Sequence, residues 1–377
     1  MTVIRRAPHQ VLFVIAAIAF GACSPAAAAP SSAVSPSPSP AAAVSSSPTA
    51  MPDATPSPTA KPSPIAVKDG EPWIVYAWYQ EGKQTKDLFL ARADGTDAHV
   101  IATDIPGEHI AASWSPDGSQ IAFVNRDEAT PLGSIWTVRA DGSDAAMLTD
   151  GGGECPDGIY HPNWSPDGSK LAVICYPDPG GKQGSVATYD LATRRVTRLY
   201  TVSWPDHLDN APSWSPDGKS LAFAIQHWDP TDQFLDGSLV ATISVDGGKE
   251  HRLTTLDTFM SAPDWSPDGS QIAMSSYDLS NMHTSSHPSN LYLIKPDGTG
   301  LHQFTHSAAD PSVRIAMPRW TLDGNRLLVG VGLAPVGSDT VNDVQVGFVD
   351  ATDPAGAEPV LFSPTIDGAY PDLRPTP

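Results

Sequence analysis

Cysteine, positive charge and long apolar runs are scarce in this chain of 377 residues. It has three cysteines, and its 22 Lys and Arg residues are outnumbered by 42 Asp and Glu residues, which gives a formal net charge of −20. This balance excludes nucleic-acid binding through a clustered basic surface, and it excludes adhesion to anionic lipid by charge. The apolar run Val11–Phe20 is too short to span a bilayer as a helix.

Enzymatic motifs are also absent from the sequence. It contains no G-x-S-x-G elbow, no P-loop, no H-E-x-x-H zinc motif and no Rossmann fingerprint. Carboxylates are numerous, but no spacing places two of them at the fixed separation that glycoside hydrolysis requires. We therefore predict no catalytic residue, no cofactor and no bound metal, and we favour a protein that is not an enzyme.

What the chain does contain is one segment repeated five times. Each copy has Trp, then Ser-Pro-Asp-Gly or a near variant, then an apolar run such as Ile-Ala-Phe. The repeat tryptophans are Trp114, Trp164, Trp214, Trp265 and Trp320, and the turn aspartates are Asp117, Asp167, Asp217, Asp268 and Asp323. A unit of this length cannot bury its own apolar face and must stack on its neighbours.

Each repeat unit predicts two β-hairpins. Asp-Gly is a tight-turn signal because Gly tolerates positive φ and Asp bonds to its own backbone. A second Asp-Gly turn follows between alternating apolar residues, as in Leu88–Ile101 and Leu291–Phe304. Two hairpins give four strands per unit, which is typical of a propeller blade. We interpret the turn aspartates as solvated structural residues.

The second hairpin occurs six times, once more than the tryptophan motif. A worn first copy at Val67–Val75 places Asp69-Gly70 in the turn, but the Pro-rich chain before it cannot supply an inner strand. Asp367–Tyr370 resembles Asp157–Tyr160, which leads into the third blade. We therefore predict an all-β, six-bladed propeller of four-stranded blades over residues 66–377. The C-terminal segment would close this ring and hide edge strands.

The pattern W-S-P-D-G-x-x-I-A-F resembles the TolB-type β-propeller repeat, within the WD-like Pro-Asp family. The resemblance covers roughly residues 66–374. The chain differs from TolB itself because no separate α/β domain precedes the propeller. We therefore do not carry over the role of TolB in envelope integrity.

The N-terminus predicts export. Residues 1–22 have the pattern of a signal peptide, and Cys23 follows Phe-Gly-Ala, which resembles a bacterial lipobox with a lipidated cysteine. Phe20 stands where Leu is usual, and the alternative is ordinary cleavage within Ala26–Ala29, which would give a secreted protein. Residues 23–65 predict a disordered Pro/Ser/Ala-rich linker. We expect an extracytoplasmic, lipid-anchored monomer.

Two cysteines, Cys155 and Cys175, flank the innermost hairpin of the third blade. Export permits a disulfide between them, which is our prediction. Two free thiols or a metal-binding pair are the alternatives, although no C-x-x-C motif supports a metal.

Comparison of the units predicts two unlike faces. One face carries the nearly uniform turns, whereas the opposite face carries variable loops and blade links, where binding residues usually lie. The candidate ligand residues on the variable face are Tyr160, His161, Asp206, His207, Asp209, Asn210, His227, Trp228, Asp229, His283 and His287. His283 and His287 lie in a loop sequence, so their spacing of four does not indicate a helical metal site.

Our leading hypothesis is a membrane-tethered binding or scaffold module that engages an envelope protein, peptide or glycan through the variable face. The alternative is a metal-assisted polysaccharide lyase or hydrolase. That alternative predicts a His-rich site at the mouth of the central channel, formed by His161, His207, His227 and His283. A third possibility, a wall spacer, accounts for the linker but not for the elaborate loops.

Overall fold

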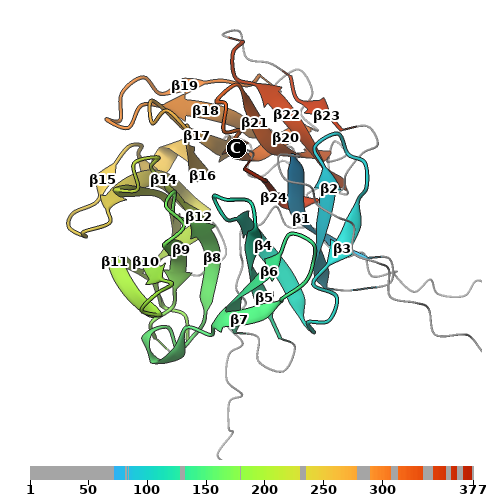
Figure 1. Cartoon of the computed structure of the whole chain (residues 1–377). Helices are drawn as coiled ribbons and strands as arrows, with labels where there is room; N and C mark the ends of the chain where they lie inside the picture. The colour runs from blue at the N-terminus through green and yellow to red at the C-terminus, as the bar shows by residue number, and fades with distance from the viewer. Residues whose placement is uncertain are drawn as a thin grey trace, which may run out of the picture.

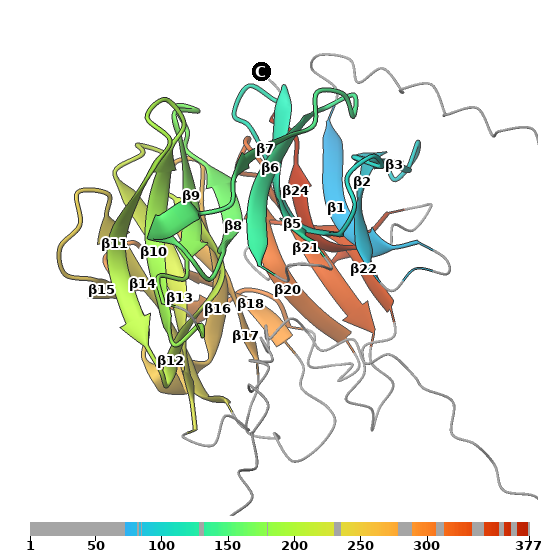
Figure 2. The same cartoon turned by 90° about the horizontal axis from the view of Figure 1, so that it is seen from below.

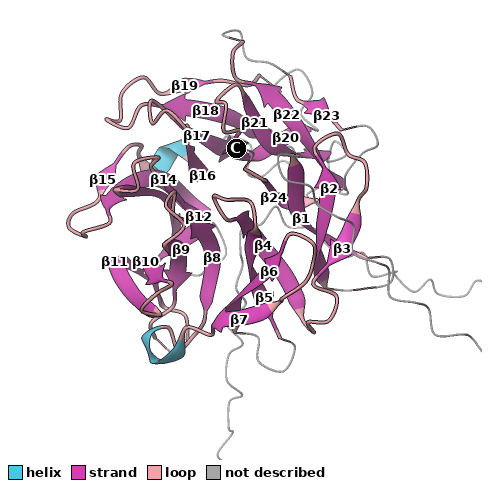
Figure 3. Cartoon of the chain, in the orientation of Figure 1, coloured by secondary structure: helices cyan, strands magenta, loops and turns pink. Residues whose placement is uncertain are grey.

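The computed structural model describes residues 72–80, 83, 85–127, 132–178, 180–229, 235–277, 289–306, 313–333, 343–353, 358–362 and 368–375. The predicted signal peptide, Cys23, the linker, the turn at Asp69-Gly70, and His283 and His287 lie outside these residues. The regular secondary structure of the described residues is β-strand, apart from two short 3-10 helices at Gly152–Glu154 and Leu256–Thr258 (Figure 3).

Four of the sheets have four strands each, and neighbouring strands within them run antiparallel. The first contains β24 (Ala369–Leu373), β1 (Trp73–Tyr79), β2 (Lys86–Arg92) and β3 (His99–Ile101). The second contains β4 (Glu108–Trp114), β5 (Gln120–Arg126), β6 (Gly133–Arg139) and β7 (Ala146–Thr149). The third contains β8 (Ile159–Trp164), β9 (Lys170–Cys175), β10 (Gln183–Asp190) and β11 (Arg195–Ser203). The fourth contains β12 (Asp206–Trp214), β13 (Ser220–Trp228), β14 (Leu235–Ser244) and β15 (His251–Arg252).

The remaining strands form one eight-stranded sheet. Its first half contains β16 (Met260–Trp265), β17 (Ile272–Tyr277), β18 (Ser289–Ile294) and β19 (His302–Gln303). Its second half contains β20 (Val313–Trp320), β21 (Arg326–Leu333), β22 (Asp343–Asp350) and β23 (Val360–Leu361). A single parallel pair, Ser289 opposite Arg314, joins the two halves.

The sheets stand around a common axis in a propeller arrangement (Figure 1). The strands β4, β8, β12, β16, β20 and β24 lie nearest the axis, and each contacts the next one around it. Figure 2 shows the same sheets from a view turned by 90°, in which they pack beside one another. The predicted all-β propeller fold is therefore confirmed. Four blades are separate sheets, whereas the last eight strands form one continuous sheet where we predicted two separate blades.

The C-terminal segment lies in the first sheet. Strand β24 runs antiparallel to β1, with Leu373 opposite Ile74, and the backbone N–H of Arg374 donates to the carbonyl of Trp73 (2.7 Å). Strand pairing therefore joins the two ends of the described chain.

The repeated turns show why Ser-Pro-Asp-Gly recurs. In the second sheet, Ser115 Oγ donates to Asp117 Oδ1 (2.6 Å), and the same oxygen accepts from the backbone N–H of Ser119 (3.0 Å). Gly118 has a φ of 66°, in the left-handed region that glycine adopts without strain. The hydroxyl–aspartate bond recurs in the four later copies of the turn. The prediction that these aspartates are structural turn residues agrees with these contacts.

The core lies between the sheets. One apolar cluster runs through the first three sheets and includes the fully buried Leu88, Phe123 and Leu171. Full burial of one such side chain stabilises the folded state by about 1.5–3 kcal/mol. Because these side chains pack across sheet boundaries, each unit depends on its neighbours for stability, as the repeat length predicts.

Every innermost strand contains an irregularity that the repeat pattern did not predict. Pairing shifts register once between each of these six strands and its partner. Near each shift stands a non-glycine residue with positive φ: Ala111 (52°), His161 (55°), Asn210 (58°), Ala262 (49°), Met317 (56°) and Tyr370 (54°). This conformation costs about 1–2 kcal/mol per residue for most side chains. A β-bulge re-aims the side chains that follow it, and here those side chains lie along the axis.

Candidate binding cavity at the channel axis

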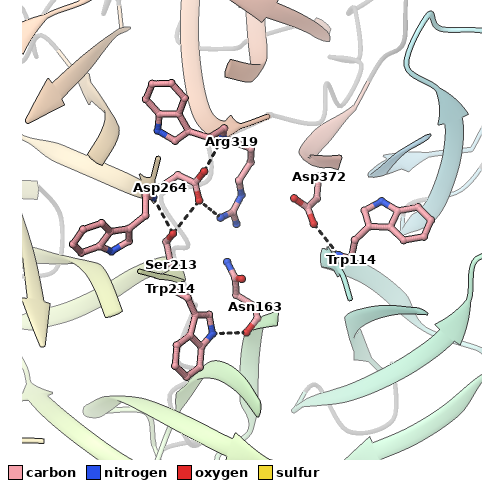
Figure 4. Close-up of polar contacts among 9 residues, drawn as sticks. Trp114, Asn163, Ser213, Trp214, Asp264, Arg319 and Asp372 are labelled. Carbon is pink, nitrogen blue, oxygen red and sulfur yellow. Dashed lines mark hydrogen bonds and ion pairs between the residues drawn. The ribbon is translucent and has the colours of Figure 1, made fainter. Parts of the chain in front are cut away.

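A cavity of about 430 Å³ opens on the axis, surrounded by the repeat motif itself. Its wall contains the repeat tryptophans and the prolines of four turns, Pro116, Pro166, Pro216 and Pro267. Its polar lining comes from the residue that precedes the last residue of each of five inner strands, or its equivalent in β24: Ser113, Asn163, Ser213, Asp264, Arg319 and Asp372. Figure 4 shows Asn163, Ser213, Asp264, Arg319 and Asp372 around the axis. The face that we interpreted as uniform scaffold therefore encloses a polar cavity.

Asp264 is the most heavily bonded of these polar residues. Its Oδ1 accepts from Ser213 Oγ (3.0 Å) and from Arg319 Nη1 (3.0 Å). Its Oδ2 accepts from the backbone N–H of Trp320 (2.8 Å). Since these partners come from β12 and β20 on either side of β16, Asp264 connects three inner strands (Figure 4).

Arg319 is the cation of the cavity lining. Its side chain is 21% exposed, and one of its nitrogens is used by Asp264. Burial alone would lower the pKa of Arg319, but the carboxylates of Asp264 and Asp372 outweigh burial and raise it. The guanidinium is therefore permanently charged, and it has five N–H donors, of which one is used in this ion pair.

Asp372 joins β24 to the second sheet. Its Oδ2 accepts from the backbone N–H of Trp114 (2.8 Å). Burial raises the pKa of Asp372 to about 6, although the charge of Arg319 and the Trp114 N–H oppose the rise. An ionised carboxylate has about four acceptor sites, so Asp372 can still accept a hydrogen bond in the cavity.

Asn163 contributes an unpaired amide to the lining. Its backbone carbonyl accepts from Trp214 Nε1 (2.9 Å), but its side chain makes no hydrogen bond within the described part of the chain. Figure 4 shows the Asn163 amide extending toward the Arg319 guanidinium and the axis. An amide offers two donors and an acceptor, so this side chain is available to a ligand.

Beyond the polar lining, the channel narrows to a waist. Here the cavity has a volume of about 30 Å³, and its lining includes the bulge residues Ala111, His161, Asn210, Ala262, Met317 and Tyr370. A space of this size holds about one water molecule. The cavity is therefore open at one end and nearly closed at the other.

The structure places the predicted ligand residues in strands rather than in links. Tyr160 and His161 lie in β8, and Asp206, His207, Asp209 and Asn210 lie in β12. His227 and Trp228 end β13, and Asp229 follows it. The expectation that the candidate residues from Asp206 to Asn210, and His227 and Trp228, lie in variable loops or blade links is therefore wrong, because these residues belong to paired strands.

These residues separate into small local groups. His227 Nδ1 pairs with Asp206 Oδ1 (2.6 Å), and His207 packs edge-on against Trp204. Asp209 is buried beside Asn210, and burial raises the pKa of its carboxyl to about 7 against opposing hydrogen bonds.

Tyr160 and His161 lie deeper. Tyr160 is buried, and its hydroxyl accepts from the backbone N–H of Gly133 (2.8 Å). Burial, together with the positive charges of Arg126 and Arg319, lowers the pKa of His161 to about 4. His161 is therefore a neutral side chain at the waist of the channel.

The histidine site of the alternative hypothesis includes His161, His207 and His227, whose recorded contacts differ. Each of the three has its own surroundings, as described above. No group of three or more His, Cys, Asp or Glu side chains in the described ranges is arranged to hold a metal ion. Cys155 and Cys175 are joined in a disulfide, which is the pairing that we predicted.

Comparison with known proteins agrees with the propeller that the repeats predict. Residues 139–278 match the model of the TolB beta propeller domain family. A solved structure of TolB from Acinetobacter baumannii superposes with a TM-score of 0.58 at 18% identity, over 81% of this chain and 67% of that one. The chain contains a TolB-type β-propeller. This TolB-type propeller matches two curated relatives over part of their lengths.

The first relative is an uncharacterized protein of Agrobacterium fabrum, 27% identical over 52% of this chain and 58% of its own length. The second is the Tol-Pal system protein TolB of Alcanivorax borkumensis, 29% identical over 34% of this chain and 27% of its own length. The chain thus spans well under two thirds of both relatives.

Our sequence reasoning missed the polar ring of the TolB-type propeller. A signal was present, because the residue before each repeat tryptophan differs between copies while the motif after it stays nearly constant. Ser113, Asn163, Ser213, Asp264 and Arg319 occupy this one variable position. A variable residue inside a constant motif indicates a position whose residue type is not required by the fold.

Proposed function

We propose that this chain is a non-catalytic, extracytoplasmic binding module that takes its ligand into the axial cavity. The observation that carries the proposal is the unused hydrogen-bonding capacity of Asn163, Arg319 and Asp372 inside a wall of tryptophan and proline. Binding sites combine an apolar wall with a few polar groups that fix the orientation of the ligand. The cavity volume of about 430 Å³ lies within the usual range of such sites, roughly 300–1,000 Å³.

We propose that the fold is a closed ring of six blades. Each half of the eight-stranded sheet contains four strands, like the separate blades, and in the described residues strand pairing between the halves is limited to Ser289 opposite Arg314. The pairing of β24 with β1 and the contacts of β24 with β4 and β20 support closure by the C-terminal segment.

We also propose that the chain is exported, tethered through Cys23 and monomeric. The kinship with a Tol-Pal system protein and the buried disulfide support an extracytoplasmic location, because disulfides persist in oxidising compartments. Among the described residues, no helix combines the length and the hydropathy needed to cross a membrane. The lipobox-like segment remains the support for lipid anchoring.

The variable face remains a second proposed contact surface for an envelope protein, peptide or glycan. Its support is the Asp206–His227 pair and the neighbouring Trp204 and His207, which bring charge and aromatic rings together. The metal-assisted lyase or hydrolase receives no support from the described histidines.

The test compares the two surfaces. The purified full chain is immobilised, and binding of a solubilised envelope fraction from the host is measured by biolayer interferometry. The Asn163→Ala variant should lose most of the signal, whereas His227→Ala on the other surface should keep it. The reverse result would move the site to the variable face, and release of cleaved polysaccharide or peptide by the chain would refute a non-catalytic role.

A further inference from the structure

The unused hydrogen-bonding groups of the cavity alternate in type. Arg319 offers only donors, the Asp372 carboxylate offers only acceptor sites, and the Asn163 amide offers both. Figure 4 shows the three side chains converging on the axis from different strands. A hydroxyl group is the small group that both donates and accepts, so a ligand with several hydroxyls can satisfy all three side chains.

The charges around the cavity disfavour an anion. The five turn aspartates each follow a residue of the wall, and hydrogen bonds from neighbouring hydroxyls hold the pKa of each carboxyl below its usual range. An anion therefore meets a ring of negative charge at the rim. Within the lining, the guanidinium of Arg319 is paired with Asp264. A neutral ligand avoids the repulsion that an anion meets at the rim.

The shape of the site limits which part of a ligand enters. The wall of tryptophan and proline offers apolar surface to the C–H faces of a sugar ring, while the hydroxyls at its edge reach the polar lining. The waist behind the lining has a volume of about 30 Å³, which is too small to hold a sugar ring. A chain therefore cannot thread through, and the cavity receives an end.

We propose that the cavity binds the neutral, hydroxyl-rich terminal sugar of a glycan. This inference rests on the proposed binding function and adds the chemical class of the ligand. The proposed binding is non-covalent, because the polar groups of the cavity act on the ligand only as hydrogen-bond donors or acceptors.

The experiment measures binding of defined saccharides to the purified full chain. The panel contains neutral mono-, di- and trisaccharides, the uronic-acid counterpart of each, and tripeptides of similar size. Titration calorimetry gives the affinity, and tryptophan fluorescence reports occupancy because the repeat tryptophans line the cavity. We expect saturable binding of a neutral saccharide, with loss of binding when its terminal unit is blocked.

Variants locate the binding. Asn163→Ala and Asp372→Asn should each weaken saccharide binding about tenfold, the effect of losing one good hydrogen bond. The controls Asn325→Ala and Asp246→Asn change the same residue types at exposed positions outside the cavity lining, and they should bind like the wild type. Asp372→Asn keeps an oxygen for the Trp114 N–H, and denaturation curves verify that both cavity variants are folded.

Two results would overturn the proposal. If a uronic acid or a tripeptide binds in the cavity better than every neutral saccharide, the ligand class is wrong while the binding function stands. If no neutral saccharide binds below millimolar concentration, the sugar proposal also fails. The envelope-binding test with Asn163→Ala then decides separately whether the cavity binds anything.

Discussion

Asp264 should be the residue of the axial ring whose removal costs most stability. In Asp264→Ala, Arg319 keeps a side chain that is only 21% exposed but loses its ion-pair partner, and Ser213 and Trp320 lose an acceptor. Breaking a fully buried pair costs about 3–5 kcal/mol. Since both partners retain some contact with solvent, we expect a loss of about 2–4 kcal/mol, a large part of a typical total of about 5–15 kcal/mol.

The assay is urea denaturation followed by tryptophan fluorescence, with the midpoint and slope fitted for each variant. Asp144→Ala is the matched control, because Asp144 pairs with Arg139 at the same kind of contact but both side chains are more than half exposed. That control should cost less than about 1 kcal/mol. The double variant Asp264→Ala/Arg319→Met should be more stable than Asp264→Ala, since it removes the orphaned charge. Equal losses in Asp264→Ala and Asp144→Ala would refute the reasoning.

Three further predictions concern closure, pH and the disulfide. Arg374→Ala should lower the free energy of unfolding by about 1–3 kcal/mol, because the buried Arg374 Nε donates to the carbonyl of Gly118 (2.8 Å); an unchanged urea midpoint would contradict this. The pKa of Asp372 is raised to about 6 in the fold, so the folded state binds more protons and this group's contribution to stability falls as pH rises from about 4 to 6. Asp372→Asn should therefore gain stability relative to the wild type at pH 7–8 and lose that gain near pH 4, and a pH-independent difference would argue against it. Replacing Cys155 and Cys175 together by Ala should cost about 3 kcal/mol on the chain-entropy model for a sequence separation of 20 residues, measured against the wild type with and without reductant.

The hairpins that form the blades were predictable from the sequence because each is determined by a short local motif. Ser115, Asp117 and Gly118 close their turn with bonds inside six residues, so the motif alone fixes the hairpin. The predicted propeller and the pairing of the C-terminal segment with β1 rest on counting such hairpins. The merging of the last two groups of four strands into one sheet depends on strand pairing at Ser289 and Arg314, which no repeat pattern encodes.

The site was harder to predict because it depends on the direction in which the side chains of the inner strands point. Ala111 and Met317 take positive φ although neither is glycine, so sequence gives no warning that their strands bulge. Unless the position of the bulge is known, the alternation of side chains along the strand does not tell which way the residue before each tryptophan points. Polar residues such as Asp206 and His207 appeared to belong to links, yet backbone pairing with β13 continues through them. Strand pairing outweighed their low strand propensity.

The bulge gives this ring an unusual freedom to diverge. Five of the six inner strands contribute one side chain just before a tryptophan, and that side chain lines the axial cavity. A ring that grows by duplication of one hairpin unit inherits identical residues at this position. Single substitutions can then change the lining one strand at a time while the turns and packed layers stay the same. Asn163 and Arg319 are examples of residues that differ from their counterparts in the other strands. A symmetric scaffold can in this way acquire an asymmetric interior without any insertion or change of strand register.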